Sequence, residues 1–473
     1  MIIRTKILAT IGPASETAEK IAQLARAGCD AFRINFSHGD PAQREAYLRD
    51  VRRVEAEAGR PIAVVADLCG PKIRTGPIVG GSVLLVEGQE LIIQREAVEG
   101  NAERISTTLN ELVDAAGAGQ IVLIDDGKLR LEVVEARPPD EVLCRVAVGG
   151  ILSTGKGVNL PDMDLALSAM TEKDRDDVAW IAERDVDYVA LSFVQRRQDV
   201  QELRELLGAG GSDAKIIAKI EKPQALAQIK EIVDAADAIM VARGDLGVEM
   251  ALPAVPVAQK RIAALCQNAG KCCIIATQML ESMTVRPTPT RAEVSDVANA
   301  VLDHADAVML SGETAVGKYP VRAVAMMNDI VSSIQAYHDE HLDLRRRVAD
   351  TPAALVSSLA MAVREIIAAE DIAAVAAFTI SGTTARILAK SRLTCPILAL
   401  SPESATVRRM CLYYGVASVQ AELREHTREV LALAERFAVA QGIARAGQKI
   451  VVVSGRPLGK PGTANTLVVH TVS

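Results

Sequence analysis

The sequence predicts an α/β protein: a (β/α)8 barrel that carries an inserted small β-barrel domain and is followed by a C-terminal α/β domain. Three observations predict this fold. Eight short apolar runs rich in β-branched residues alternate with amphipathic helical patterns, short strands replace helices between about 69 and 164, and strand–helix alternation restarts beyond about 344. Eight repeats favour a closed barrel, although the pattern alone is also compatible with an open sheet.

The eight barrel strands are placed by the ends of their apolar runs. These runs end at Ile11, Asn35, Asp67, Phe193, Glu221, Ala242, Thr277 and Ser311. In barrels of this type the active site lies at the carboxyl ends of the strands, so we expect functional side chains at or just beyond these positions.

The stretch that interrupts the barrel after its third strand contains strand-like runs at 83–86, 121–124 and 142–148. Asp126 and Gly127, between two such runs, form a strong hairpin-turn signal. Beyond about 344, a helix, an apolar strand at 373–380, a second helix and strands near 397–400 and 450–453 predict a separate α/β domain. The predicted domains are 1–68 with 165–343 for the barrel, 69–164 for the insertion and 344–473 for the C-terminal domain.

Bulk composition excludes several classes of function. The chain has 473 residues, so several hydrophobic cores are expected. Its net charge is −7, which provides no general positive field for nucleic acid, and no apolar run is long enough to cross a bilayer. The first ten residues lack the pattern of a secretory signal, so we expect a cytoplasmic protein. The eight cysteines lack metal-ligand spacing and are expected to be reduced.

Charged and polar side chains gather at the predicted strand ends: Arg33, Asn35, Ser37 and His38 on the second strand, Asp67 on the third, Lys219 and Glu221 on the fifth, Arg243 and Asp245 on the sixth, and Thr277 on the seventh. Lys219 and Glu221 share one face of their strand, where a simple ion pair would give the same pattern, and the glycines around Asp245 could merely permit a turn. Two carboxylates on neighbouring strands nevertheless suit Mg2+. With Arg33, Arg74 and Lys156 they indicate a polyanionic substrate.

Six segments carry a family resemblance. They are 33–39 (Arg-Ile-Asn-Phe-Ser-His-Gly), 70–74 (Gly-Pro-Lys-Ile-Arg), 156–161 (Lys-Gly-Val-Asn-Leu-Pro), 219–221 (Lys-Ile-Glu), 240–247 (Met-Val-Ala-Arg-Gly-Asp-Leu-Gly) and 276–283 (Ala-Thr-Gln-Met-Leu-Glu-Ser-Met). In this order they resemble the pyruvate kinases, and the resemblance spans nearly the whole chain. It implies a phosphotransferase that converts phosphoenolpyruvate and ADP to pyruvate and ATP, the last step of glycolysis.

The resemblance also implies residue roles. Glu221 and Asp245 would hold Mg2+, or Mn2+ in its place. Lys219, Thr277, Arg33 and Arg74 would be catalytic, with Lys219 stabilising the transferring phosphoryl group and the enolate, and Thr277 relaying a proton through water. The implied substrate-binding set is Arg33, Lys219, Ala242, Arg243, Gly244, Asp245 and Thr277, with backbone N–H groups near Gly244 serving the substrate carboxylate. The implied nucleotide-binding set is Asn35, His38, Arg74 and Lys156. The inserted domain would be a lid that hinges near 69–72 and 159–162 and excludes water.

One departure from the commonest family pattern concerns potassium. Many members bind K+ with residues that correspond here to Asn35, Ser37, Asp67 and the carbonyl after that Asp, and they carry Glu where this chain has Lys72. Here Leu68 follows Asp67, and the charge at position 72 is reversed. A lysine ammonium can replace a monovalent cation beside phosphates, so the chain resembles the potassium-independent branch and K+ is not expected to be required. The alternative is that Lys72 points into solvent and K+ still binds.

A second phosphate site is expected in the C-terminal domain. Thr379, Ser381, Gly382, Thr383 and Thr384 follow a strand and open a helix, where free N–H groups favour anions, and they resemble the family's effector loop. Arg456 and Lys460 could complete a site for a phosphorylated effector, and the family expectation is a homotetramer. The same turn is also an ordinary capped helix start.

Two other classes of function remain open on the sequence. A barrel lyase or aldolase could use the same metal carboxylates, but it needs neither the cluster of Arg33, Asn35 and His38 nor a lid. A catalytically silent metabolite sensor could keep the C-terminal loop, but Lys219, Glu221, Asp245 and Thr277 are all present.

Overall fold

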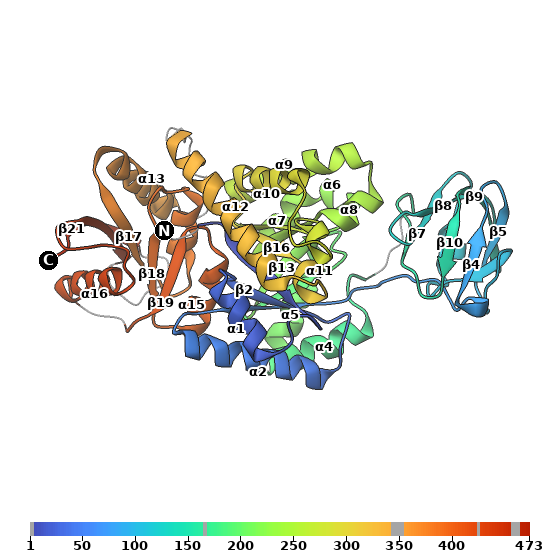
Figure 1. Cartoon of the computed structure of the whole chain (residues 1–473), viewed down its shortest axis with the longest axis horizontal. Coiled ribbons are helices and arrows are strands. Elements are labelled where there is room, and N and C mark those ends of the chain that lie inside the picture. Colours follow the sequence, from blue (N-terminus) through green and yellow to red (C-terminus); the bar gives the residue numbers. More distant parts are fainter. Residues whose placement is uncertain (1–3, 164–167, 342–353, 423–425, 456–463) are drawn as a thin grey trace.

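The computed structural model describes residues 4–163, 168–341, 354–422, 426–455 and 464–473. Figure 1 shows three units in a row, with a barrel in the middle, the C-terminal unit at one end and the inserted strands at the other. In the described part of the chain, every helix is too short or too polar to span a membrane.

The middle unit is a closed barrel of eight parallel strands, in the order β1-β16-β15-β14-β13-β12-β3-β2. Its strands are β1 (Lys6–Ile11), β2 (Ala31–Asn35), β3 (Ala63–Asp67), β12 (Tyr188–Leu191), β13 (Lys215–Ile220), β14 (Ala238–Ala242), β15 (Cys272–Ala276) and β16 (Ala307–Leu310). The closed barrel confirms the predicted fold class and removes the open-sheet alternative.

Helices surround the barrel. They are α1 (Ala18–Arg26), α2 (Pro41–Ala58), α4 (Glu172–Ala182), α5 (Arg197–Ala209), α6 (Pro223–Ala227), α7 (Ile229–Ala235), α8 (Arg243–Glu249), α9 (Val255–Ala269), α10 (Arg291–Leu302), α11 (Gly312–Ala315) and α12 (Pro320–His341). Local sequence sets several of their starts: Thr171 and Thr290 each form a capping box with an acidic residue three positions later. One core lies between strands and helices, and a second fills the barrel interior around Leu8, Tyr188 and Ile274.

Four strand ends differ slightly from the prediction. Strands β13, β15 and β16 end one residue early, and β12 ends at Leu191 rather than Phe193. For two of them the backbone gives the reason, because Phe193 and Thr277 have positive φ values of 57° and 66° and so leave the extended conformation.

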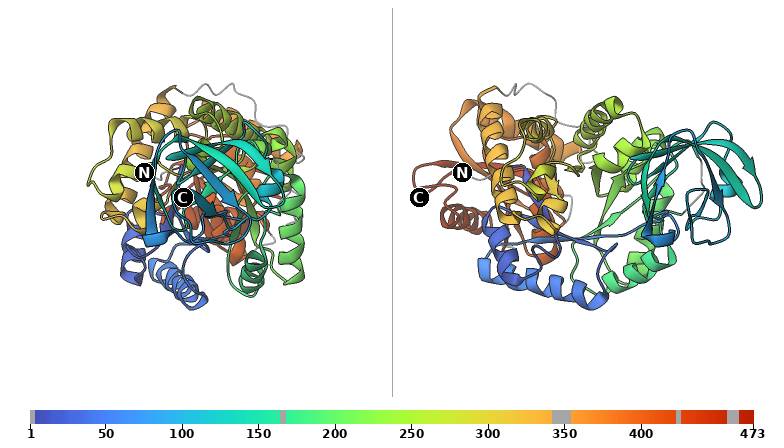
Figure 2. Two further views of the ribbon diagram at one scale, coloured as in Figure 1. Left: turned by 90° about the vertical axis from the view of Figure 1, so that its right-hand side faces the viewer. Right: turned by 45° about the vertical axis from the view of Figure 1, so that its right-hand side comes forward.

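The inserted segment consists of strands, one short α-helix and a 3-10 turn, η1 (Val79–Gly81). Its elements are β4 (Ser82–Leu85), β5 (Glu90–Gln94), β6 (Arg104–Ser106), α3 (Leu112–Ala115), β7 (Ile121–Ile124), β8 (Leu129–Arg137), β9 (Glu141–Val148), β10 (Gly150–Ser153) and β11 (Val158–Asn159). They form a six-stranded and a two-stranded sheet around their own core, and β7 and β8 make the predicted hairpin at Asp126-Gly127. Figure 2 shows these strands in front of one end of the barrel.

The C-terminal unit is a five-stranded sheet in the order β19-β18-β17-β20-β21, parallel except for the last strand. Its elements are α13 (Ala354–Ala369), β17 (Ile372–Phe378), α14 (Thr383–Lys390), β18 (Ile397–Ser401), α15 (Ser404–Arg409), β19 (Val416–Gln420), α16 (Thr427–Ala440), β20 (Lys449–Gly455) and β21 (Ala464–Thr471). The expected limits near 164/165 and 343/344 lie outside the described residues, as do Arg456 and Lys460.

Buried ion pairs join the C-terminal unit to the amino-terminal end of the barrel. Asp306, just before β16, is 1% exposed and pairs with Lys390 and with Arg392, whose Nη2 lies 3.1 Å away. Asp187, just before β12, pairs with Arg408 of α15 at 2.9 Å. The two units therefore share countercharges as well as apolar contacts.

Candidate active site

The carboxyl ends of the barrel strands surround a small polar cavity of about 80 Å3, on the side of the barrel that faces the inserted unit. Its lining contains many of the site residues predicted from the sequence, namely Arg33, Asn35, Ser37, Asp67, Leu68, Lys72, Lys219, Glu221 and Asp245, together with Cys69, Ser192 and Phe193. The structure thus brings together residues from β2, β3, β12, β13 and the start of α8.

Asp67 is the buried anion at the centre of this group. It is 1% exposed, and its Oδ2 lies 2.5 Å from Arg33 Nε while its Oδ1 lies 3.2 Å from Lys219 Nζ. Burial alone would raise the pKa of Asp67, but the positive charges of Lys219 and Arg33 outweigh that effect and lower it. Asp67 therefore stays ionised and fixes two cations at the carboxyl-terminal end of the barrel, where the small cavity opens and which we call the mouth.

Lys219 and Glu221 do form an ion pair, with Nζ 2.8 Å from Oε1. Burial disfavours the charged ammonium, yet Asp67 and Glu221 outweigh burial and raise the pKa of Lys219. The other Glu221 oxygen accepts the backbone N–H of Phe193 at 2.9 Å. Lys219 is thus a permanent cation at neutral pH, and Glu221 is held in one orientation.

Asp245 lacks a comparable partner cation in direct contact among the described residues. The Asp245 side chain is reached by solvent, although many protein atoms surround it. The partial loss of water around the carboxylate, followed by the negative charge of Glu221, raises the pKa of Asp245 to about 6. Lys219 and Lys72 offset only part of this. Glu221 and Asp245 together therefore form a site with excess negative charge.

Thr277 follows β15 in a conformation that β-branched residues rarely adopt, with φ of 66°. Its Oγ1 donates to the Ala276 carbonyl at 2.6 Å and accepts the Gly244 N–H at 2.7 Å. Arg243 donates to the Thr277 carbonyl at 2.9 Å and pairs with Asp296 at 2.7 Å. The Gly244 N–H that was expected to serve a substrate carboxylate is thus bonded to Thr277 in this structure.

Two further cavities adjoin the mouth. One of about 540 Å3 is lined by Arg243, Gly244, Asp245 and Thr277, and Ala242 lies buried at the end of β14 beside it. The other, of about 450 Å3, lies between barrel and inserted unit and is lined by Lys72, Arg74, Lys156 and Asp245. Asp245 and Asp126 line both.

The residues expected to bind nucleotide do not all share one cavity. Arg74 donates to the Gly155 carbonyl at 3.0 Å, and Lys156 pairs with Asp125 at 2.9 Å, both within the inserted unit. Asn35 is instead the last residue of β2, and His38 lies in the loop that follows this strand. Burial, followed by Lys72 and the nearby arginines, lowers the pKa of His38, so that side chain lies within range of their charges.

The predicted effector loop lies at the start of α14, whose N-cap residue is Gly382 and which has no side-chain capping hydrogen bond among the described residues. Gly382, with φ of 80°, precedes α14; its N–H donates to Thr379 Oγ1 at 3.0 Å, and the hydroxyls of Ser381 and Thr383 lie 3.0 Å apart. Thr384 is buried, whereas Ser381 is exposed. This geometry is compatible with both interpretations of the loop.

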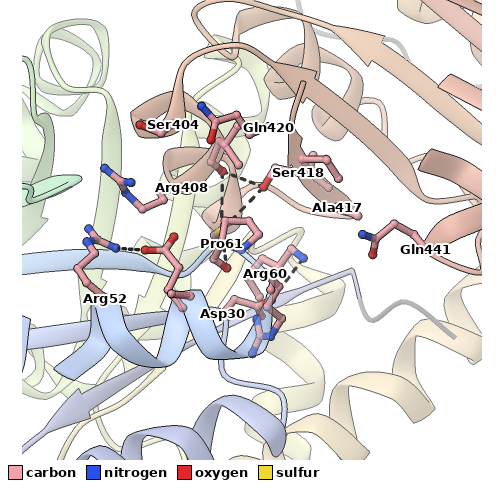
Figure 3. Close-up of a pocket in the computed structure, with 18 residues that line it drawn as sticks. Asp30, Arg52, Arg60, Pro61, Ser404, Arg408, Ala417, Ser418, Gln420 and Gln441 are labelled. Carbon is pink, nitrogen blue, oxygen red and sulfur yellow. Dashed lines mark hydrogen bonds and ion pairs between the residues drawn. The ribbon is translucent and has the colours of Figure 1, made fainter. Parts of the chain in front are cut away.

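A further cavity lies at the opposite end of the barrel and was not anticipated from the sequence. It has a volume of about 670 Å3, and Figure 3 shows it between Asp30, Arg52 and Arg60 of the barrel and Arg408, Ser418 and Gln420 of the C-terminal unit. It contains none of the predicted site residues. Its walls come from segments far apart in the chain, so no local sequence motif could have predicted it.

Ser192 and Phe193 are the residues of the mouth that sequence reasoning missed. Phe193 was treated only as a strand end, and Ser192 belongs to none of the six motif segments. Their contacts with Lys219 and Glu221 depend on the turn after β12, for which the sequence contains no glycine or other signal.

Comparisons with known proteins agree with this geometry. Residues 2–324 match the model of the pyruvate kinase barrel domain, and residues 357–470 match the model of the pyruvate kinase alpha/beta domain. Similar proteins include a pyruvate kinase of Geobacillus stearothermophilus, 41% identical over 99% of this chain and 80% of that protein. Pyruvate kinases of Methylorubrum extorquens and Agrobacterium vitis are 42% and 43% identical, over 99% of this chain and 98% and 97% of their own lengths. On these matches, the chain belongs to the pyruvate kinase family.

Proposed function

We propose that the protein transfers the phosphoryl group of phosphoenolpyruvate to ADP and protonates the resulting enolpyruvate to pyruvate. Membership of the family supports this activity. The observation that carries it is the convergence of Arg33, Lys219, Glu221 and Asp245 on one cavity at the carboxyl ends of the barrel. Phosphoryl transfer requires mainly fixed positive charge and positioning, which such a cavity supplies.

Glu221 and Asp245 would hold the divalent ion, Mg2+ or Mn2+. The raised pKa of Asp245 supports this assignment, because the negative charge of Glu221 contributes to it and a cation between the two carboxylates would neutralise that charge. Among the residues with described placement, no cluster of three or more acidic, histidine or cysteine side chains could bind a metal unaided. Mg2+ commonly takes one or two carboxylates and fills its shell with substrate oxygens and water. When bound, it supplies positive charge beside the substrate oxygens.

Lys219 and Arg33 would balance the charge of the transferring phosphoryl group. The Asp67 carboxylate pairs with both side chains, with Lys219 Nζ at 3.2 Å and Arg33 Nε at 2.5 Å. Because the pKa of Lys219 is raised, this residue acts as a fixed cation and not as the proton donor. Arg74 and Lys156 would enter from the inserted unit, so that closure of this lid brings two more cations to the phosphates and excludes water.

The proton for the methylene carbon would pass through Thr277. Its strained backbone conformation supports a functional role, since such outliers persist where the surroundings impose them. Its hydroxyl proton is donated to Ala276 in this structure, so delivery requires rotation of the hydroxyl and a water that replaces the lost proton. Ala242, Arg243 and Gly244 would surround the pyruvate end.

Lys72 would take the place of K+. It lines the small cavity with Asn35, Ser37, Asp67 and Leu68, and its charge is close enough to affect the pKa values of Asp245 and His38. Both oxygens of Asp67 already face cationic side chains. These observations support activity without potassium, whereas the exposure of Lys72 is equally compatible with the alternative in which its side chain points into solvent and K+ still binds.

The remaining proposals concern regulation and assembly. Thr379, Ser381, Gly382, Thr383 and Thr384 would bind a phosphorylated effector, supported by the convergence of hydroxyl and N–H groups before α14. A homotetramer in the cytoplasm is proposed on the family resemblance.

The test is pyruvate formation from phosphoenolpyruvate, ADP and Mg2+, first without K+ and then with it. High activity in both buffers is expected, and Lys72→Glu should make the enzyme depend on added K+. Lys219→Met should reduce turnover strongly, whereas Lys230→Met, at an exposed ion pair with Asp234, serves as the matched control. Pyruvate release that does not need ADP would indicate a lyase. The absence of pyruvate formation with every phosphorylated effector tried would indicate a metabolite sensor.

A further inference from the structure

Ser192 is a buried hydroxyl at the mouth of the barrel for which no role has been given. It follows β12 and is 2% exposed. Its Oγ lies 2.7 Å from Lys219 Nζ and 2.8 Å from the Leu68 carbonyl oxygen. Asp67 Oδ1 is a second, more distant acceptor at 3.4 Å. The hydroxyl has a single proton, which it donates to the nearer Leu68 carbonyl, and it offers a lone pair to the Lys219 ammonium.

Lys219 has three N–H groups and three acceptors around it. Two are carboxylate oxygens, of Asp67 at 3.2 Å and of Glu221 at 2.8 Å, and the third is Ser192 Oγ. A flexible four-carbon chain between two anions could settle nearer either of them. The Ser192 hydroxyl accepts a third hydrogen bond from the ammonium and carries no negative charge. It therefore restricts the position of Lys219 Nζ without neutralising the positive charge that faces a substrate.

The turn that carries Ser192 is itself rigid. The next residue, Phe193, has φ of 57°, an unfavourable conformation for a bulky side chain, and its N–H donates to Glu221 at 2.9 Å. Gly70, where the chain leaves for the inserted unit, packs so closely that an added Cβ would lie 3.2 Å from Ser192 Cβ and 2.5 Å from the Phe193 ring. The Ser192 hydroxyl is therefore a fixed point on which Lys219 can be aligned.

We propose that Ser192 is a positioning residue for Lys219, holding the ammonium where it meets the negative charge that develops during phosphoryl transfer. This inference rests on the proposed function. Ser192 acts through Lys219 and not on the substrate, so its loss should weaken stabilisation of the transition state more than binding of the substrate.

The experiment compares Ser192→Ala, Ser192→Thr and Ser192→Val by steady-state kinetics with phosphoenolpyruvate, ADP and Mg2+. Loss of a hydrogen bond to a charged group predicts a decrease in kcat of roughly ten- to a hundredfold in the Ala and Val variants, with KM for phosphoenolpyruvate changed by less than about twofold. Thr and Val have the same shape, so recovery of kcat in Thr alone would assign the effect to the hydroxyl. Ser418→Ala is the matched control, because Ser418 is also buried and donates to a carbonyl, that of Val407 at 2.8 Å, far from the mouth.

The outcomes separate the two proposals. A wild-type enzyme that forms no pyruvate would refute the proposed function. An active wild type with an equally active Ser192→Ala variant would refute only the positioning role, as would a rise in KM at constant kcat. If the added methyl group crowds Gly70 and both branched variants are inactive, a crystal structure of the Ala variant decides: Lys219 Nζ in its original place would overturn the inference.

Discussion

Asp67→Asn tests the central electrostatic argument about the barrel mouth. The substitution keeps the size of the side chain but removes one negative charge from a buried cluster that retains two cations. Lys219 would keep Glu221, whereas the remaining described partner of the Arg33 side chain would be neutral, Thr10 Oγ1 at 3.1 Å. Removing one member of a buried ion pair typically costs 3–5 kcal/mol, and the remaining solvent access of Arg33, whose side chain is 11% exposed, favours the lower limit of about 3 kcal/mol.

Asp67→Asn should also reduce activity, because Arg33 and Lys219 would no longer be held in place by the Asp67 carboxylate. Displacement of a catalytic group by about 1 Å can cost roughly a hundredfold in rate, so kcat/KM for phosphoenolpyruvate should fall by at least that factor. Stability can be followed by urea unfolding with tryptophan fluorescence, because Trp180, the single tryptophan, lies on helix α4 of the barrel and packs against Phe36. It therefore reports on the unit that contains Asp67.

The pH dependence provides a second measurement on the same variant. Lys219 and Arg33 lower the pKa of Asp67 in the folded state below its unfolded value, so this carboxylate stabilises the protein above the unfolded pKa and loses that effect as pH falls through the folded one. The stability difference between wild type and Asp67→Asn should consequently shrink in acid.

Asp177→Asn is the matched control for this variant. Asp177, on α4, is also buried and faces two cations, Arg44 of α2 at 2.7 Å and Lys173 at 2.5 Å, but it does not line the cavity at the strand ends. It should lose comparable stability and keep its kcat. Equal stability of Asp67→Asn and wild type at neutral pH, or a kcat/KM within twofold, would refute the reasoning.

Three further predictions concern the mouth and the hinge. Lys72→Gln should raise the pKa of His38, which burial and the neighbouring cations lower, and an unchanged NMR titration would place Lys72 away from the ring. Native protein should expose one reactive thiol, that of half-buried Cys69, because the other seven cysteines are buried; Cys69→Ser should remove it, and a second fast-reacting thiol would contradict the packing. Asp174 accepts the Cys69 N–H at 3.0 Å and also caps α4. Asp174→Asn should therefore lower the free energy of unfolding in urea by about 1–3 kcal/mol and speed limited proteolysis near residues 69–72. An unchanged cleavage rate would show that Asp174 does not hold this hinge segment in place.

Much of the barrel could be predicted because its signals are local. Each strand is a continuous apolar run with polar residues at its carboxyl end, and parallel closure brings those ends together whatever the loop lengths. The expectation that Lys219 and Glu221 share a face needed only the two-residue period of a strand, and the structure has them 2.8 Å apart.

The parts that escaped prediction depend on contacts between distant segments. Asp67 was identified only as part of a cation-binding region, although it anchors Arg33 and Lys219. The turn at Ser192 and Phe193 adopts a positive φ without glycine, because packing against Gly70 and the bond to Glu221 impose it. In the C-terminal unit, β19 and β21 were missed, since each contains polar residues on its exposed side that interrupt the apolar run.

The buried pairs around Asp306 limit how the protein can be divided or recombined. Apart from the Cys273 N–H at 2.7 Å, the described partners of this carboxylate are Lys390 and Arg392, both from the C-terminal unit. A barrel excised near residue 343 would keep the anion and lose both cations, a change that normally costs several kcal/mol. A chimera that exchanges C-terminal units between family members must therefore match this charge pattern, even though each unit has its own sheet.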